Sequence, residues 1–400
     1  MRLAHICGTP AIHAESAAPA VQKGIIVMKR LYLTVPTLLG TEQIVANEIR
    51  HLGYETSEVK DGSVTFEGDA EAICLANINL RSAERIMIKL AEFKATSFEE
   101  LFEKTKLIKW ESIIEKDAAF PVKGHSVRSA LHSVPDCQSI IKKSIVTRLS
   151  AHYGIAHFEE TGPLYPIQFA IMKDIVTIYI DTSGENLYKR GYREKSVLAP
   201  MRETLAYSMI DLSFWRGDRI FLDPFCGSGT LPIEAALYAT NTAPGIKRRF
   251  VAETWRNHIP REMWRSVREE ARENARPNTK TLIYASDINP EAIAIAKKNA
   301  ENAGVANKIK FSVCDVAKLT PFKDKGVIVC NPPYGERLMD AKSCERLYRT
   351  MGYKFAEFSS AKKFILTSHE KFEQFYGSFA DKRRKVYNGM LKCYIYQYFK

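Results

Sequence analysis

The sequence predicts an α/β protein whose C-terminal half forms a mostly parallel sheet covered by helices on both faces. From about residue 184 onward, strand-like and helix-like segments alternate, which is typical of parallel sheets. A glycine-bearing turn at residues 223–230 joins an apolar strand to a helix. Before residue 184, short strands, helices and a hairpin pattern indicate a smaller α+β region.

The pattern over residues 28–93 predicts a ferredoxin-like α+β domain. Residues 30–35 alternate as a strand, residues 40–52 carry apolar side chains at helical spacing, and residues 63–66 return as a short strand. Residues 1–27 are Ala-rich and have neither the apolar core nor the basic start of a signal peptide. We therefore expect residues 1–27 to be a disordered extension outside the fold.

Residues 94–183 predict a second α+β domain. We expect a helix over 97–114, a strand over 119–122, a polar basic stretch over 123–128 and a helix that continues through Leu149. Residues 167–171 and 175–180 alternate on either side of Lys173-Asp174, which indicates a hairpin. Cations on these segments and just after them are the candidate contacts to an anionic partner: Lys123, Arg128, Lys142, Lys143, Arg148, Lys189 and Arg190.

The bulk composition favours a polyanionic partner. The net charge is +12 and the isoelectric point is about 9.1, and neutralising phosphates releases counterions and promotes association. No segment reaches the ~18 uncharged apolar residues of a membrane helix, so no membrane partner is expected. The eight cysteines show no CxxC pair and the nine histidines no ligand spacing, which predicts a reducing cytoplasm and no metal site.

Five further strands are expected in the C-terminal half, followed by a closing hairpin. They cover residues 219–222, 281–285, 309–313, 327–330 and 363–366. The hairpin joins two apolar runs through Asn388-Gly389, a dipeptide that suits a tight turn.

The turn after the first of these strands predicts a cofactor site. Gly227-Ser-Gly229 bends the chain without a Cβ, and Pro232 in the next turn marks a helix start. Free N–H groups and the positive helix end would hold the carboxylate of S-adenosylmethionine. A dinucleotide is the alternative, but GxGxxP lacks the third glycine of such sites. The expected contacts are Asp223, Pro224, Phe225, Cys226, Gly227, Ser228, Gly229 and Thr230, with Cys226 a small space-filling residue.

Two acids follow the next two strands. Asp287, with Ile288 beside it, would accept hydrogen bonds from both ribose hydroxyls; capping the following helix is the structural alternative, and the two roles are compatible. Asp315 would accept a hydrogen bond from the adenine amino group, unless it is an ordinary loop carboxylate.

About sixty residues separate Asp223 from Asp287, whereas ~20 is typical of nucleotide-binding α/β units. The sequence therefore predicts an insertion over residues 240–277. It is rich in arginine and contains Trp255 and Trp264. Two interpretations remain open: contact with RNA phosphates, or a solvated helix face with compensating glutamates.

Asn331-Pro-Pro-Tyr334 follows the strand at 327–330 and predicts a site for an exocyclic amino group. The side-chain carbonyl of Asn331 and the main-chain carbonyl of Pro332 can accept its two N–H groups and direct its lone pair. Pro332 and Pro333 make the loop rigid, and Tyr334 can stack on a base that has left its helix. Adenine N6, guanine N2 and a glutamine amide fit equally, and a chance turn is the structural alternative.

Together these features resemble those of THUMP-containing class I (Rossmann-like) RNA methyltransferases of the guanine-N2 type. The element order of residues 95–182 resembles a THUMP domain, and Tyr188–Arg193, Ala199–Leu205 and Asn331–Leu338 resemble family segments. The closing hairpin resembles the antiparallel strand pair that ends a seven-stranded class I sheet. The resemblance implies a THUMP RNA-binding domain over 94–183 and a catalytic domain over 184–400, without the second fused methyltransferase domain of some relatives.

The resemblance also implies a reaction. S-adenosylmethionine would methylate the N2 of a guanine in RNA, with 23S ribosomal RNA as the expected substrate and tRNA-acting relatives close behind. Glu336 and Arg337 would help to recognise guanine or brace the loop as an ion pair. The rival functions are an N6-adenine-specific DNA methyltransferase and a non-catalytic RNA-binding factor of ribosome assembly.

Overall fold

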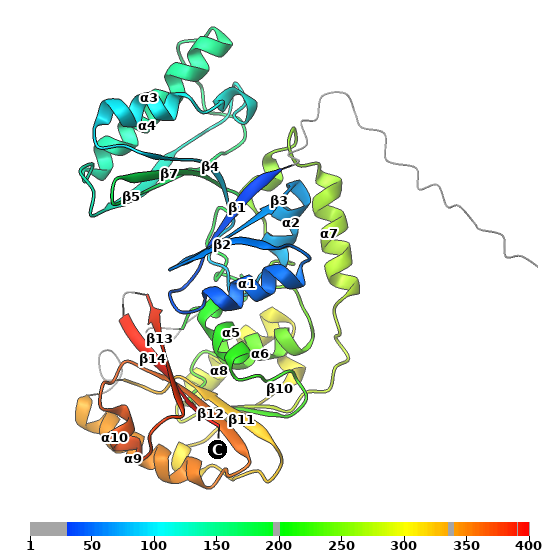
Figure 1. Cartoon of the computed structure of the whole chain (residues 1–400). Helices are drawn as coiled ribbons and strands as arrows, with labels where there is room; N and C mark the ends of the chain where they lie inside the picture. The colour runs from blue at the N-terminus through cyan, green and yellow to red at the C-terminus, as the bar shows by residue number, and fades with distance from the viewer. Residues whose placement is uncertain (1–29, 195–200, 335–339, 390, 400) are drawn as a thin grey trace, which may run out of the picture.

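The computed structural model describes residues 30–194, 201–334, 340–389 and 391–399. These residues form two seven-stranded sheets, one in each half of the chain, with helices packed on them (Figure 1). The predicted fold class is therefore confirmed. The extension at 1–27, the segment 195–200, and Glu336 and Arg337 lie outside the described residues. No helix in the described ranges is long and apolar enough to cross a membrane.

The first sheet has the strand order β2-β3-β1-β4-β7-β6-β5. Its strands are β1 Leu31–Pro36, β2 Thr56–Lys60, β3 Ser63–Gly68, β4 Met87–Lys94, β5 Val122–Val127, β6 Ile167–Met172 and β7 Ile175–Asp181. Its helices are α1 Glu42–His51, α2 Ala70–Asn79, α3 Phe98–Lys106 and α4 Val134–Tyr153, and a 3-10 turn, η1, covers Trp110–Ser112. The predicted helix at 97–114 corresponds to two elements, α3 and η1. The predicted basic stretch at 123–128 is mostly strand, because β5 pairs in parallel with β6.

Strand β4 joins the two predicted N-terminal domains into one sheet. It pairs antiparallel with β1 on one side and with β7 on the other. The expected boundary between residues 93 and 94 thus falls at the end of a shared strand. Periodicity did not reveal β4, because most of its side chains are only partly buried on either face.

The second sheet has the order β10-β9-β8-β11-β12-β14-β13. Its strands are β8 Ile220–Asp223, β9 Ile283–Asp287, β10 Ile309–Val313, β11 Gly326–Cys330, β12 Ala361–Thr367, β13 Lys382–Asn388 and β14 Leu391–Tyr398. β8 to β12 are parallel, whereas β14 runs antiparallel to both of its neighbours. The predicted strands and the closing hairpin are all present.

Two apolar clusters cover the two faces of this sheet. Phe221 and Val327 face the core beneath α5 Glu203–Leu212, α6 Thr230–Ala239 and α8 Pro290–Ala303. Leu222 and Ile328, their chain neighbours, face the core beneath α9 Ala341–Ala356 and α10 Phe372–Tyr376. Successive strand residues point to opposite faces, so strands that are apolar throughout are buried on both sides.

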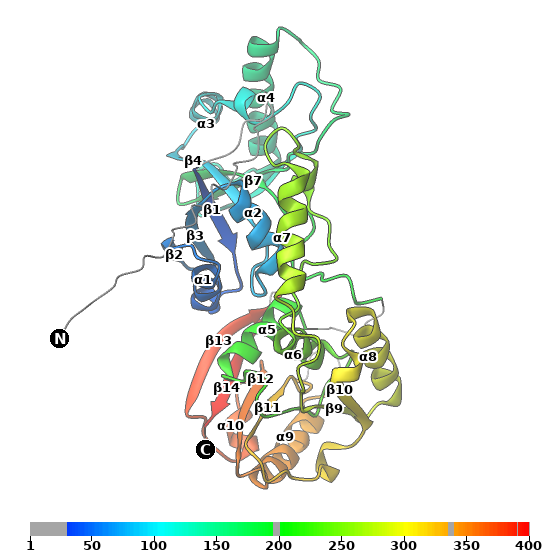
Figure 2. The ribbon, with the colours of Figure 1, turned by 90° about the vertical axis from the view of Figure 1, so that its right-hand side faces the viewer.

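The insertion after α6 packs against the N-terminal half. It contains the 3-10 turn η2 Val251–Thr254 and helix α7 Arg261–Glu273, which lies alongside α2 (Figure 2). Trp255 is fully buried, stacks on Tyr165 with ring centroids 4.7 Å apart, and donates its indole N–H to the Leu164 carbonyl at 2.7 Å. The insertion thereby fixes the C-terminal half to the first sheet.

Replacing Trp255 with alanine should test this connection. The change removes a buried indole and a hydrogen bond, so we expect the free energy of unfolding to fall by about 3 to 5 kcal/mol. Urea denaturation followed by circular dichroism measures the loss. Tyr353→Ala is the matched control, because that ring is 83 % exposed and its removal should change stability by less than about 0.5 kcal/mol. A loss below about 1 kcal/mol for Trp255→Ala would contradict the role given to the insertion.

Candidate active site

The candidate site lies at the carboxyl ends of three neighbouring parallel strands. β8 is flanked by β9 and β11, and the strand order reverses around it. Asp223 and Asp287 are the last residues of β8 and β9, and Asn331 directly follows β11. Open α/β sheets bind ligands at such a switch point, so the sheet brings together the two predicted half-sites.

The turn from β8 to α6 is shaped by its glycines. Gly227 and Gly229 have φ angles of 50° and 87°, which favour glycine. A Cβ on Gly229 would lie 3.0 Å from the Cβ and 3.2 Å from the Cα of Ala296 on α8. The side-chain amide of Asn299 on the same helix donates to the Ser228 carbonyl at 3.0 Å. The turn therefore lies flat against α8, and the amides that open α6 have no acceptor within their helix.

Asp287 connects this turn to α8. One carboxylate oxygen accepts the Gly227 N–H at 3.0 Å, and the other accepts the Asn289 N–H at 2.9 Å. A carboxylate oxygen can accept more than one hydrogen bond, so both remain able to bind ribose hydroxyls. The alternative role as a helix cap is wrong, because Asn289 caps α8. Ile288, 67 % exposed, lies next to Asp287 at the rim.

Asp223 has a structural role within the turn. Its side chain is buried and accepts the Phe225 N–H at 3.1 Å. Burial, with a smaller effect of the Asp287 carboxylate, raises the pKa of Asp223 well above its usual value. Burial likewise raises the thiol pKa of Cys226 and of Cys330, which keeps both protonated. This supports the interpretation of Cys226 as a space-filling residue and extends it to Cys330.

Asp315 follows β10, the neighbour of β9. It caps a short 3-10 turn, η4 Val316–Lys318, by accepting the Ala317 N–H at 2.9 Å. This bond uses one carboxylate oxygen, and the second is left for a ligand.

The loop after β11 is held from both sides. The buried Tyr348 hydroxyl on α9 donates to the Pro333 carbonyl at 2.8 Å, and burial raises its pKa so that it stays a donor. Asn388 on the closing hairpin donates its side-chain amide to the Tyr334 hydroxyl at 3.1 Å. The Oδ1 of Asn331 is buried and has no hydrogen-bond partner within the described residues. A buried acceptor without a partner is costly, and an amino group in the pocket would satisfy it.

Sequence reasoning missed a charged cluster behind the cofactor turn. Arg193 donates to the Thr230 hydroxyl at 2.9 Å and pairs with Glu203 at 2.9 Å. It thus adds positive charge at the start of α6, where an anionic group is expected. The signal for this cluster was the Tyr188–Arg193 run, in which three of six residues are cations.

The structure separates the predicted RNA contacts into three groups. Lys123, Arg128, Lys143 and Lys189 are exposed, although Lys189 pairs with Glu185 at 2.7 Å. Lys142 and Arg148 are partly buried in ion pairs with Glu160 and Glu111. The prediction for Arg190 is wrong: its guanidinium is buried, pairs with Glu234 and donates to two backbone carbonyls. The fixed geometry of the guanidinium suits this internal network.

No group of three or more histidine, cysteine or acidic side chains in the described part of the chain could hold a metal ion. The glycine turn with Asp287 and Asp315 instead fits a nucleoside cofactor with an anionic tail, whereas the unpartnered Asn331 oxygen fits an amino group. The fold and site define a class I methyltransferase that uses S-adenosylmethionine.

Comparison with known proteins identifies the family. The model of the "RMKL-like, methyltransferase domain" matches residues 190–397, that of the "RlmL ferredoxin-like domain" residues 32–87, and that of the THUMP domain residues 95–181. "Putative RNA methyltransferase YpsC" of Bacillus subtilis is 48% identical over 93% of this chain and 96% of its own. The chain therefore belongs to the RMKL-like methyltransferase family.

Other relatives extend the comparison. "Ribosomal RNA large subunit methyltransferase K/L" of Psychromonas ingrahamii is 34% identical over 91% of this chain, which spans about half (49%) of that relative. The structure of SMU.472, described as "a putative methyltransferase complexed with SAH", is 40% identical with a TM-score of 0.88, over 93% of this chain and 98% of its own. A Listeria monocytogenes structure, described as "a predicted N6-adenine-specific DNA methylase", is 46% identical with a TM-score of 0.87. The match covers 93% of this chain and 96% of that structure's chain.

Asp287→Ala should weaken cofactor binding. The substitution removes charge-assisted hydrogen bonds worth ~1.5 to 3 kcal/mol, so affinity for S-adenosylmethionine should fall by about ten- to hundredfold in calorimetry. Asp324→Ala, which removes an exposed acid, is the control and should bind as the unmodified chain does. Unaltered affinity of Asp287→Ala would refute the ribose assignment.

Glu203 should make stability depend on pH. Burial raises its pKa to about 7 in the folded chain, against an opposing effect of Arg193. The folded state therefore holds this proton more tightly than the unfolded state, and the free energy of unfolding should fall by up to about 3 kcal/mol as pH rises from ~4.5 to ~7. Urea titrations across this range should show a flatter curve for Glu203→Gln and an unchanged one for the exposed Glu99→Gln. Equal slopes for Glu203→Gln and the unmodified chain would contradict the assignment.

Proposed function

We propose that this protein transfers a methyl group from S-adenosylmethionine to the exocyclic N2 of a guanine in RNA, and that this RNA is 23S ribosomal RNA. The observation that carries the proposal is the buried Oδ1 of Asn331, an acceptor without a partner beside the cofactor turn. It is the group needed to hold one N–H of an amino nucleophile.

The chemistry follows from this acceptor. A base amino group is a weak nucleophile because its lone pair is delocalised into the ring. The Asn331 side chain and the Pro332 carbonyl would each accept one N–H, which directs the lone pair toward the methyl carbon. When bound, S-adenosylmethionine supplies that carbon: the new N–C bond forms as the S–C bond breaks, its electron pair stays on sulfur, and the nitrogen then loses a proton.

The surrounding contacts favour a fixed geometry. The Tyr348 hydroxyl on α9 donates to the Pro333 carbonyl, and the Asn388 amide on β13 donates to the Tyr334 hydroxyl. Tyr334 would stack on the extruded guanine. Alignment of this kind can supply several kcal/mol of the barrier reduction, because the reacting atoms are already ordered before the transition state is reached.

RNA is favoured over DNA as the substrate by the domains that precede the catalytic half. The THUMP and RlmL ferredoxin-like matches, and the name of the K/L relatives, support a large-subunit ribosomal RNA. Adenine N6 presents the same pair of N–H groups, as the name of the Listeria relative reflects, so the product must be identified directly.

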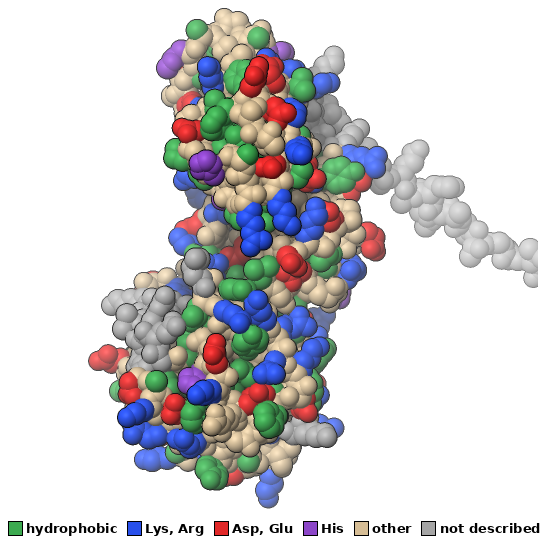
Figure 3. Space-filling model, turned by 60° about the vertical axis from the view of Figure 1, so that its left-hand side comes forward, with side chains coloured by type: hydrophobic (Ala, Val, Ile, Leu, Met, Phe, Trp, Pro, Cys, Tyr) green, Lys and Arg blue, Asp and Glu red, His purple; other side chains and the backbone are tan. Residues whose placement is uncertain are grey.

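We also propose the division into a ferredoxin-like domain at 28–93, a THUMP domain at 94–183 and a catalytic domain at 184–400. The ranges of the family matches support it, with β4 shared between the first two. Exposed cations of the N-terminal half would guide RNA toward the site. Figure 3 shows Lys and Arg side chains grouped at the waist of the molecule and on its lower part. The cysteine spacings, which include no CxxC pair, favour a reducing cytoplasm as the setting.

Asn331→Ala should separate catalysis from cofactor binding. Removing one hydrogen-bond partner of the reacting nitrogen should lower kcat by roughly 10²- to 10³-fold, whereas calorimetry should give a nearly unchanged Kd for S-adenosylmethionine. Asn307→Ala, an exposed asparagine on the 3-10 turn η3 Ala306–Lys308, is the matched control. Equal losses of turnover and cofactor affinity would refute the division of roles.

The product distinguishes the candidate reactions. Purified protein, labelled cofactor and ribosomal RNA from a strain lacking the gene should yield N2-methylguanosine in nucleoside mass spectrometry. N6-methyladenosine would overturn the guanine assignment, methylation of tRNA alone would overturn the ribosomal one, and no methylated nucleoside would overturn the catalytic proposal.

A further inference from the structure

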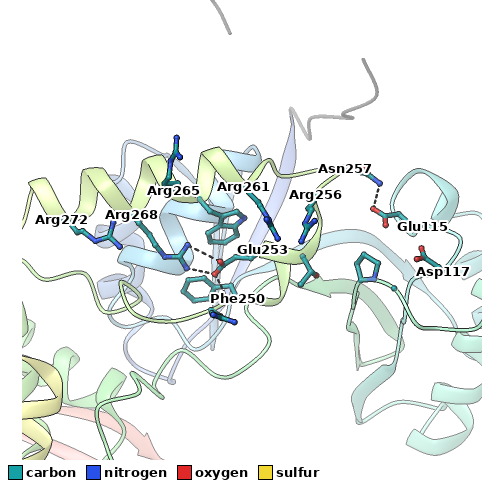
Figure 4. A pocket seen from close by; sticks show the side chains of 15 residues that line it. Glu115, Asp117, Phe250, Glu253, Arg256, Asn257, Arg261, Arg265, Arg268 and Arg272 are labelled. Carbon is teal, nitrogen blue, oxygen red and sulfur yellow. Dashed lines mark hydrogen bonds and ion pairs between the residues drawn. The ribbon is translucent and has the colours of Figure 1, made fainter. Parts of the chain in front are cut away.

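The insertion and the THUMP region enclose a large groove. Its volume is about 1020 Å³, at the upper end of small-molecule pockets. One wall is α7 with the segment before it, and the other contains Glu115, Asp117 and the Gly162-Pro163 turn (Figure 4). Six arginines line it: Arg249, Arg256, Arg261, Arg265, Arg268 and Arg272. Against them the lining has three carboxylates, so the groove is strongly basic.

Helix α7 separates its charges by face. At 3.6 residues per turn, the spacing i, i+4, i+7, i+11 places four arginines on one stripe: Arg261, Arg265, Arg268 and Arg272. The adjacent stripe is buried in the N-terminal core and consists of Trp264, Val267 and Ala271. All four glutamates of α7 lie off the arginine stripe: Glu262, Glu269 and Glu273 border it on the side away from the buried residues, and Glu270 lies nearly opposite it. A solvated face with compensating acids would interleave the two signs, whereas here they are segregated.

Most of the groove arginines lack an acidic partner. Arg268 pairs with Glu253 at 2.6 Å, and Arg265 only approaches Glu269 at 3.7 Å, with both side chains more than half exposed. The other four form no ion pair or side-chain hydrogen bond with any described residue: Arg249, Arg256, Arg261 and Arg272. All four are exposed, and Figure 4 shows Arg256 and Arg261 side by side between α7 and the opposite wall.

The aromatic side chains of the groove do not form a base-stacking surface. Trp264 and Phe250 are buried and stack on each other, with ring centroids 5.5 Å apart. Arg268 lies over both rings. A groove that offers guanidinium groups and no exposed ring suits phosphates rather than bases, because a guanidinium binds phosphate oxygens in a bidentate manner.

We propose that this groove binds the sugar–phosphate backbone of the substrate RNA at a distance from the modified nucleotide. A four-residue step along α7 advances ~6 Å, so its arginines present a row of positive charges to a chain that carries one negative charge per nucleotide. The groove lies on the opposite side of the molecule from the β13–β14 hairpin, which contacts the catalytic loop (Figures 1 and 2). This inference rests on the proposed function, because the RNA must also reach Asn331.

The salt dependence of RNA binding tests the groove. The probe is a fluorescently labelled, unmodified 23S ribosomal RNA transcript, titrated with the full chain at salt concentrations between about 50 and 200 mM. The double variant Arg256→Ala, Arg261→Ala should bind at least tenfold more weakly at the lowest salt. The slope of log affinity against log salt concentration should be smaller in magnitude by roughly one to two, since each lost phosphate contact removes ~0.7 to 0.9 from it.

Matched controls make the result specific. Lys297→Ala with Lys298→Ala removes the same charge from the exposed face of α8 and should leave the slope unchanged. Both double variants should keep the wild-type Tm and the wild-type affinity for S-adenosylmethionine. Equal losses in the two double variants, or an unchanged slope in the arginine variant, would overturn the proposal. The proposal would also be overturned if a polyglutamate peptide required Arg256 and Arg261 for binding but RNA did not.

Failure of the groove and failure of the proposed function give different results. Asn331→Ala should lose methyl transfer and keep the wild-type salt slope, because binding does not require the reaction. If the unmodified chain methylates no RNA but the arginine variant still flattens the slope, the groove is confirmed and the catalytic assignment is wrong. If the unmodified chain methylates RNA but the arginine variant leaves the slope unchanged, the catalytic assignment is supported and the groove proposal is wrong.

Discussion

The arrangement of this protein depends on the parallel pairing of β8 with β9 on one side and β11 on the other. This pairing brings the glycine turn, Asp287 and Asn331 to one edge of the sheet, although more than a hundred residues separate the first from the last. Because β8 is buried on both faces, a slip of one residue would exchange Phe221 and Leu222 between the two cores and disrupt their packing. The geometry of the candidate site is therefore fixed by the core beneath it.

The site itself combines rigid support with an unsatisfied acceptor. Asp287 and Asn299 fix the glycine turn, and Tyr348 and Asn388 fix the catalytic loop from two further elements. Within this framework the Asn331 oxygen is left without a partner. Proteins rarely leave a buried acceptor unsatisfied, and such exceptions favour a functional explanation. Here the missing donor has the chemistry of an amino group.

The insertion carries a segment of the C-terminal half into the core of the first sheet. Its tryptophans are buried against the first sheet, while its arginines line the groove opposite the THUMP wall. One segment thus serves two purposes, since the apolar stripe of α7 fixes its position and the adjacent stripe presents positive charge. Both tryptophan rings are buried, so the insertion presents its cations rather than these rings to a partner.

The sequence was enough to predict the parallel sheet, the glycine turn, and the placement of Asp287 and Asn331 at strand ends, because these features follow from local periodicity and backbone sterics. It also located the insertion by the unusual distance between two acids. Three features became visible only in the folded chain: β4 joins the first two domains, Arg190 is buried against Glu234, and Arg193 reaches Thr230. Each of these depends on a partner distant in sequence, and neither composition nor spacing specifies which distant groups meet when the core closes.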